Sequence, residues 1–104
     1  MIRIHVKLHE GSIKELEVKG HAGYAESGKD LVCAGVSCIM YGIYNTLVEL
    51  SKDGFSYKLD DGYFKINTDK TDIVTQTVLK TALVQLETMH TSYANYIKMK
   101  KTEV

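Results

Sequence analysis

Hydrophobic and polar residues alternate at the start of the chain, where four apolar positions are separated by polar ones: Ile2, Ile4, Val6 and Leu8. A period of two is typical of a strand with one buried face. Residues 10–12 predict a hairpin turn, and residues 13–19 predict a second strand with Leu16 and Val18 inward. Because Ile13 is out of phase with these two residues, we expect a β-bulge or a later strand start.

The spacing becomes helical over residues 31–52. Apolar side chains fall on one narrow stripe at 100° per residue, namely Val32, Val36, Ile39, Met40, Ile43, Leu47 and Leu50. Asp53 and Gly54 are expected to end this helix. Residues 55–59 and 63–67 then predict a second hairpin around Asp60-Asp61-Gly62.

A second helix is predicted from residues 69–72 to about Lys98. Its expected buried face consists of Val78, Leu79, Ala82, Leu86, Met89, Tyr93, Tyr96 and Ile97. Basic residues at positions 98, 100 and 101 suit the negative end of a helix dipole. The predicted order is ββαββα, which favours a two-layer α+β domain whose sheet is covered on one face by two helices.

Composition narrows the functional classes. The 104 residues predict a single domain over 1–104, with 44% hydrophobic and 25% charged residues. The formal net charge is zero, so no direct nucleic-acid partner is predicted. No continuous apolar run reaches the roughly 18 residues of a membrane span, so no membrane partner is predicted.

The two cysteines, Cys33 and Cys38, are predicted to lie about 140° apart around one helix. They are therefore not expected to form a disulfide, which fits a reducing cytoplasm. Their spacing is not typical of a zinc site, and His5 and His9 are expected to be solvated strand residues. We predict no metal and no cofactor.

Candidate chemistry is concentrated in residues 20–37. His21 follows a strand, and Gly20, Gly23 and Gly28 mark the loop after it. Asp30 is the expected N-cap, which places Cys33 at the third helical position. There the helix dipole favours a thiolate, unpaired N–H groups can hold an oxyanion, and a nearby histidine can accept the thiol proton.

Other residues and other interpretations of this region stay open. Ser37 lies one turn after Cys33 and can donate a hydrogen bond near the sulfur, although helix serines usually bond their own backbone. Cys33 can equally be a small buried apolar residue, and His21 a loop residue bonded to backbone. Residues 23–30 approach a phosphate-binding loop, but Asp30 stands where that motif needs Ser or Thr.

The same residues resemble the ribosomal-processing cysteine protease Prp family. The resemblance is carried by Gly20-His21-Ala22 followed by Gly28-x-Asp30-x-Val32-Cys33-Ala34-x-Val36-Ser37. The family usually has Ala-Ala after its cysteine, whereas this chain has Ala34-Gly35. Length and predicted element order agree over the whole chain.

The resemblance implies a cysteine endopeptidase that removes a short N-terminal extension from large-subunit ribosomal protein twenty-seven. It assigns catalysis to Cys33 and His21. Asp30 can orient His21 as a third residue, but its capping role explains it equally well, and a Cys–His dyad can be sufficient. It also implies a homodimer and a mobile loop between the catalytic pair. The expected dimer surface is one side of the first helix, at Ala34, Cys38, Tyr41 and Asn45. The alternative hypothesis is a non-enzymatic, ribosome-associated module that binds a peptide or protein and uses Cys33 only for packing.

Overall fold

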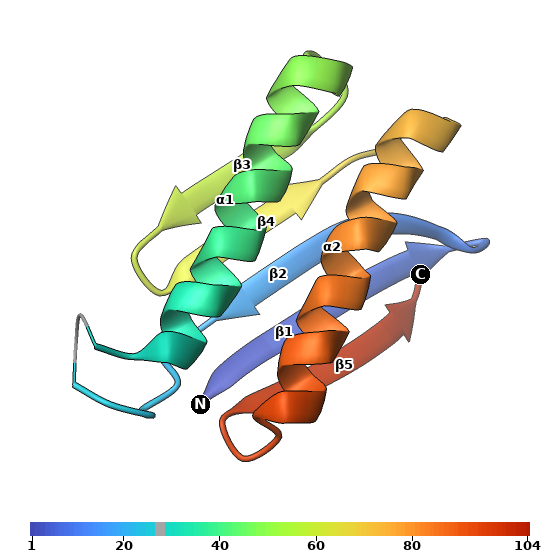
Figure 1. Cartoon of the computed structure of the whole chain (residues 1–104). Helices are drawn as coiled ribbons and strands as arrows, with labels where there is room; N and C mark the ends of the chain where they lie inside the picture. Colours follow the sequence, from blue (N-terminus) through green and yellow to red (C-terminus); the bar gives the residue numbers. More distant parts are fainter. Residues whose placement is uncertain (27–28) are drawn as a thin grey trace.

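The computed structural model describes residues 1–26 and 29–104. Seven elements follow one another along the chain (Figure 1): β1 (Ile2–His9), β2 (Ser12–Lys19), α1 (Leu31–Ser51), β3 (Ser56–Asp60), β4 (Tyr63–Asn67), α2 (Ile73–Ser92) and β5 (Ile97–Glu103).

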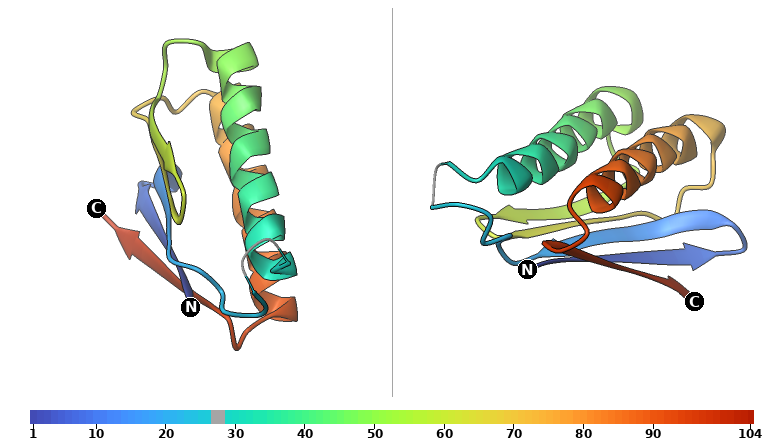
Figure 2. Two further views of the ribbon diagram at one scale, coloured as in Figure 1. Left: turned by 90° about the vertical axis from the view of Figure 1, so that its left-hand side faces the viewer. Right: turned by 60° about the horizontal axis from the view of Figure 1, so that its bottom comes forward.

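The five strands form one sheet in the order β3-β4-β2-β1-β5. β5 pairs with β1 in parallel, and the other three pairs are antiparallel. Both helices lie on the same face of the sheet, and the other face carries no helix (Figure 2). The predicted two-layer α+β architecture is confirmed.

The end of the chain differs from its prediction. α2 ends at Ser92 instead of continuing to Lys98, and residues 97–103 form the edge strand β5. The apolar stripe of α2 stays in helical phase through Tyr93, Tyr96 and Ile97, and this hides the short alternation that begins at residue 97. The order is therefore ββαββαβ, and α2 supplies the crossover that a parallel strand pair requires.

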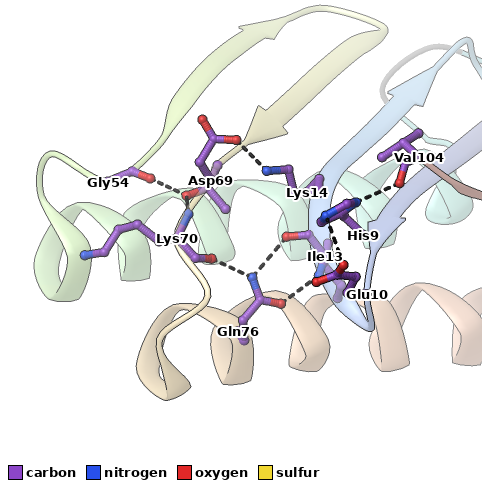
Figure 3. A network of polar contacts seen from close by, with 10 residues as sticks. His9, Glu10, Ile13, Lys14, Gly54, Asp69, Lys70, Gln76 and Val104 are labelled. Carbon is purple, nitrogen blue, oxygen red and sulfur yellow. Dashed lines mark hydrogen bonds and ion pairs between the residues drawn. The ribbon is translucent and has the colours of Figure 1, made fainter.

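The predicted bulge is confirmed at the β1–β2 hairpin. Lys7 pairs with Glu15 and Leu8 pairs with Ile13, which leaves Lys14 as the extra residue. The Gln76 amide donates to the Ile13 carbonyl at 3.0 Å and accepts from the Ile13 N–H at 2.7 Å (Figure 3). One side chain thus satisfies the backbone groups of Ile13 beside the bulge and joins the hairpin to α2.

The helix α1 lies beside α2 in the helical layer (Figure 1). Its buried apolar residues are Val32, Val36, Met40, Ile43 and Leu47, whereas Leu50 is exposed, contrary to its prediction. By length and composition α1 is apolar enough to cross a membrane, but the core helix of a globular domain has the same character. Gly35 lies where an added Cβ would be 2.7 Å from the Met89 methyl carbon, so glycine permits close packing against α2.

Candidate active site

A cavity of about 240 Å³ lies beside the segment that leads from β2 towards α1. Four of the predicted site residues line it: Gly20, His21, Cys33 and Ser37. Its remaining lining consists of core residues, the exposed Tyr41 of α1 and the β3–β4 turn: Ile2, Val18, Val36, Phe64, Tyr41, Asp60, Asp61 and Gly62. Residues from four parts of the sequence therefore meet at one hollow.

Asp30 caps α1 as predicted. Its Oδ1 atom accepts the N–H groups of Val32 and Cys33, both at 3.0 Å, and its Oδ2 atom accepts the Tyr24 N–H at 3.0 Å. The Ala34 N–H donates to the Asp30 carbonyl. The expectation of unpaired N–H groups at positions 32–34 is therefore wrong, because the cap consumes these donors.

A different backbone donor lies next to the cysteine sulfur. The Ala22 N–H points at Cys33 Sγ, with 3.2 Å between nitrogen and sulfur. Ala22 is buried, while Cys33 is half-buried. This contact joins the loop after β2 to the first turn of α1, and a fixed donor at this place stabilises negative charge on the sulfur.

His21 is held at its backbone and rests on the β3–β4 turn. Its carbonyl accepts the Met1 ammonium at 2.5 Å. Its ring lies against Gly62, where an added Cβ would be 2.7 Å from His21 Nε2. Within residues 1–26 and 29–104, no hydrogen bond joins this ring to the sulfur of Cys33, although both residues line the same cavity.

The β3–β4 turn is the part of the site that the sequence did not predict. The Gly20 N–H donates to the Gly62 carbonyl at 2.9 Å, which fixes the turn beside the start of the loop. This neighbourhood exists because β4 pairs with β2. Only the strand order reveals it, and the sequence did not predict that order.

The loop glycines differ in what they do. Gly20 has φ +93°, and an added Cβ would lie 2.5 Å from the Met1 carbonyl oxygen, so both the angle and the space require glycine. Gly23 also has a positive φ, at +70°, but it faces open space. Gly28 lies outside the described residues. Tyr24, which follows Gly23, packs edge-on against Tyr93 and Tyr96. Its ring centroid lies 5.8 Å from that of Tyr93 and 5.1 Å from that of Tyr96.

Cys38 is exposed and does not line this cavity. A larger hollow of about 710 Å³ lies between the β1–β2 hairpin and α2, but its lining contains no cysteine, histidine or carboxylate. In the part of the chain that the structure describes, no group of three His, Cys, Asp or Glu side chains is placed to hold a metal ion. The chemistry therefore points to the smaller cavity.

The electrostatics of Asp30 follow from its cap. Burial raises the pKa of this carboxyl, but N–H donors from Cys33, Tyr24, Ala25 and Val32 outweigh burial and place the pKa below its ordinary value. A depressed carboxyl pKa adds stability above the pKa of the unfolded chain, and this stability is lost as pH falls through the folded-state value.

Asp30→Ala is expected to lower the free energy of unfolding by about 1 kcal/mol. Asp30→Asn keeps one oxygen for the cap and loses only the acceptor for Tyr24, so it is expected to cost less. The difference in free energy of unfolding between wild type and Asp30→Asn is expected to become smaller below about pH 4, where the Asp30 carboxylate becomes protonated. Denaturant unfolding at pH 7 and pH 3.5 measures both effects, and equal losses for the two variants at pH 7 would show that capping is the wrong account.

Gly62→Ala is expected to displace the His21 ring, because the new methyl group would overlap Nε2. Gly11→Ala is the matched control, since Gly11 has φ +83° in the β1–β2 hairpin and no atom within 4 Å of an added Cβ. Both variants carry the strain of alanine at positive φ, about 1–2 kcal/mol. Only Gly62→Ala is expected to lose activity, by about 10- to 100-fold; equal losses in both would assign the effect to stability.

Comparison of the whole chain with known proteins finds one matching family. The family model described as cysteine protease Prp matches residues 1–98. Ribosomal processing cysteine protease Prp of Staphylococcus aureus (strain Mu50) is 32% identical over 103 residues, which cover 95% of this chain and 97% of the relative. The Bacillus subtilis (strain 168) protein of the same name is 32% identical over 100 residues, with 88% of each chain covered.

Solved structures agree with the sequence comparison. The crystal structure of the S. aureus protease with a covalently linked product peptide matches at a TM-score of 0.92 and 30% identity, covering 98% of this chain and 100% of that one. A second S. aureus structure, in complex with a substrate peptide, matches at a TM-score of 0.86 and 29% identity, with the same coverage.

Proposed function

This chain belongs to the Prp family of cysteine proteases, and we propose that it removes a short N-terminal extension from large-subunit ribosomal protein twenty-seven. The observation that carries the proposal is the meeting of His21 and Cys33 in one cavity, with the Ala22 N–H directed at the sulfur. The name of its relatives, ribosomal processing protease, supports a ribosomal protein as the substrate.

The proposed chemistry is acyl transfer. The Cys33 thiolate attacks the scissile carbonyl, and a carbon–sulfur bond forms as the carbonyl oxygen takes the negative charge. His21 then protonates the leaving amine as the peptide bond breaks, which leaves a thioester on Cys33. His21 next takes a proton from water, whose oxygen bonds to the thioester carbon. The carbon–sulfur bond then breaks, Cys33 leaves as the thiolate, and the acid product loses its proton to become the new carboxylate. The covalently linked product peptide of the S. aureus protein supports a covalent step.

The Ala22 N–H is our candidate donor to the oxyanion. Asp30 occupies the donors of Val32 and Cys33, whereas Ala22 donates to the sulfur itself. Sulfur loses its negative charge when it bonds to the scissile carbon, and the new oxyanion forms on the oxygen of that same carbon. The N–H can then turn to that oxygen with little movement, and this is stabilisation realised only as the reaction proceeds.

The direct test is incubation with ribosomal protein twenty-seven carrying its extension, followed by mass spectrometry. The extended protein is expected to be cut once at the extension, and the mature protein to stay intact. If the extended protein is bound but never cut, the chain is a binding module instead of a protease for this substrate.

Alkylation distinguishes the enzyme from the binding module by a second route. Cys38 is exposed and Cys33 is half-buried in the single chain, so exposure alone predicts that Cys38 reacts first with iodoacetamide at a dilution that keeps the protein monomeric. An activated nucleophile at Cys33 reverses this order. We therefore expect Cys33 to react faster, and its modification to abolish cleavage.

We further propose that the protein is a cytoplasmic homodimer. Ala34, Cys38, Tyr41 and Asn45 are exposed on one side of α1, and small and apolar residues at this spacing permit a second backbone to approach. Sedimentation at micromolar concentration is expected to give twice the monomer mass, and Ala34→Arg to reduce it to the monomer. A monomer mass for the wild type would refute the dimer.

The loop over residues 20–29 is proposed to order further when substrate binds. Its described part is attached at Ala22, through the bond to Cys33, and at Tyr24, through Asp30. Substrate that enters the cavity meets the first of these contacts, so closure of the loop can place His21 against the reacting bond and exclude water.

A further inference from the structure

The face of the sheet opposite the helices separates charge in a way that the zero net charge of the chain conceals. Register and burial place seven cationic side chains on this face: Arg3, Lys7, Lys19, Lys58, Lys65, Lys98 and Lys100. The same registers place only three carboxylates there: Glu15, Glu17 and Asp60. The rest of the molecule is acidic by the difference, and the face without a helix in Figure 2 is basic.

Two of the three carboxylates on this face already form ion pairs with three of its seven cations. Glu15 lies 3.4 Å from both Lys7 and Lys65. Glu17 accepts the Tyr63 hydroxyl at 2.7 Å and pairs with Lys19 at 3.7 Å.

The remaining cations have no such partner. Over the described ranges 1–26 and 29–104, no acidic side chain pairs with the other four cations, Arg3, Lys58, Lys98 and Lys100. All four are exposed.

Three cations of this face lie directly beside one another in the register of the strands. Arg3 is the register partner of Lys98 on β5 and of Lys19 on β2, so three positive charges lie in one row across three strands. Like charges at directly opposite positions destabilise a sheet. Neighbouring strands are about 4.8 Å apart, so the row spans about 10 Å. A face that keeps this repulsion is suited to an anion of comparable length.

We propose that this face, named here the basic sheet face and defined by the seven cations above, binds the phosphate backbone of double-helical RNA. A sheet that binds single strands offers free aromatic rings for base stacking. Here the only Phe, Tyr or Trp among the described outward positions, Tyr63, carries the ammonium groups of Lys19 and Lys58 at 5.9 and 5.8 Å from its ring centroid. The rings of His5 and His9 on this face are hydrogen-bonded to Thr102 and to the Val104 carbonyl. Phosphate contact without stacking is typical of duplex recognition.

The choice of RNA as the source of the phosphates rests on the proposed function, since a ribosomal substrate belongs to an RNA–protein particle. The basic sheet face lies on the opposite side of the sheet from the core residues that line the Cys33 cavity. Binding there leaves the cavity open and brings the protease to the particle that carries its substrate.

The test compares two triple variants with equal charge loss. Arg3→Gln/Lys98→Gln/Lys100→Gln removes three of the four unpaired cations of the basic sheet face and keeps Lys58, whose ammonium group lies over the Tyr63 ring. Lys52→Gln/Lys70→Gln/Lys80→Gln removes three exposed cations from the helical side of the molecule. Fluorescence anisotropy with a 20-base-pair RNA duplex gives the affinity at several salt concentrations, and cleavage of the extension peptide is measured in the same samples.

We expect wild type to bind the duplex in the micromolar range at low salt, no more weakly than DNA of the same sequence. The sheet-face variant is expected to lose at least tenfold in affinity. The slope of its log K against log salt concentration is expected to be less steep than that of wild type by roughly two to three. The helical-side variant is expected to bind like wild type. Peptide cleavage is expected to stay unchanged in both variants, so failure of the proposed function shows separately as absence of cleavage in wild type.

Thermal unfolding controls for folding, because relief of repulsion is expected to leave the midpoint of the sheet-face variant equal to or above that of wild type. Should that variant unfold early, Lys98→Gln/Lys100→Gln on the edge strand repeats the test. Four results would overturn the proposal. They are no RNA binding at low salt, equal loss of RNA affinity in both triple variants, tighter binding of DNA than of RNA, or binding of polyglutamate or phosphatidylserine vesicles in place of RNA.

Discussion

Cys33→Ser is expected to lose peptidase activity by roughly 1,000-fold or more while keeping its fold. A hydroxyl is far less acidic than a thiol, so at neutral pH it supplies almost no anionic nucleophile. The Ala22 N–H that donates to the sulfur can donate equally to an oxygen, so the loop is expected to stay attached. Removal of a nucleophile in other hydrolases costs at least this much. Cleavage of the extended substrate, followed by mass spectrometry, gives the ratio.

Cys38→Ser is the matched control for that loss. It makes the same chemical change on the same helix, at an exposed position outside the cavity. Its activity is expected to stay within a few fold of wild type. A folded but inactive Cys38→Ser enzyme would overturn the assignment, as would an active Cys33→Ser enzyme.

His21→Ala is expected to lower activity by about 100- to 10,000-fold, the range typical of a general acid–base residue. The ring lines the cavity but makes no described bond to the sulfur, so its removal is expected to leave the Ala22–Cys33 contact intact. The fold is expected to survive, because the side chain of His21 is exposed and its carbonyl makes the bond to Met1. Alkylation of Cys33 near neutral pH is expected to slow.

His90→Ala is the control for His21→Ala, because His90 lies near the end of α2 and does not line the cavity. It is expected to retain full activity and the wild-type alkylation rate. If His21→Ala alkylates at the wild-type rate and still cleaves the substrate, the histidine has no role in activating the thiol.

Local patterns were sufficient to predict most of the elements. Alternation predicted β1 and β2, and the phase error at Ile13 predicted the bulge that the register shows at Lys14. Asp30 was found from its residue type and its place before an apolar stripe, and its cap is confirmed. These features depend on neighbours within a few residues, where periodicity and capping chemistry determine the structure.

Features that depend on long-range pairing were missed or mistaken. β5 was predicted as helix because Tyr93, Tyr96 and Ile97 continue a helical stripe, and only its parallel pairing with β1 makes the segment a strand. The contact of Gly62 with His21 depends on the pairing of β4 with β2. The N–H groups of Val32 and Cys33 were expected to be free, but a single Asp30 oxygen accepts from both of them. Residue type predicts an N-cap and does not say how many N–H groups the cap binds.

The central claim is that Cys33 forms the covalent bond to the substrate. The most direct measurement is acid quenching of wild-type protein during turnover of the extended substrate, followed by mass spectrometry of the protein digested at low pH. The account predicts a transient thioester between the N-terminal fragment of the substrate and Cys33, with none on Cys38, and no adduct in Cys33→Ser. Turnover without any adduct on Cys33, or with the adduct on Cys38, would contradict it.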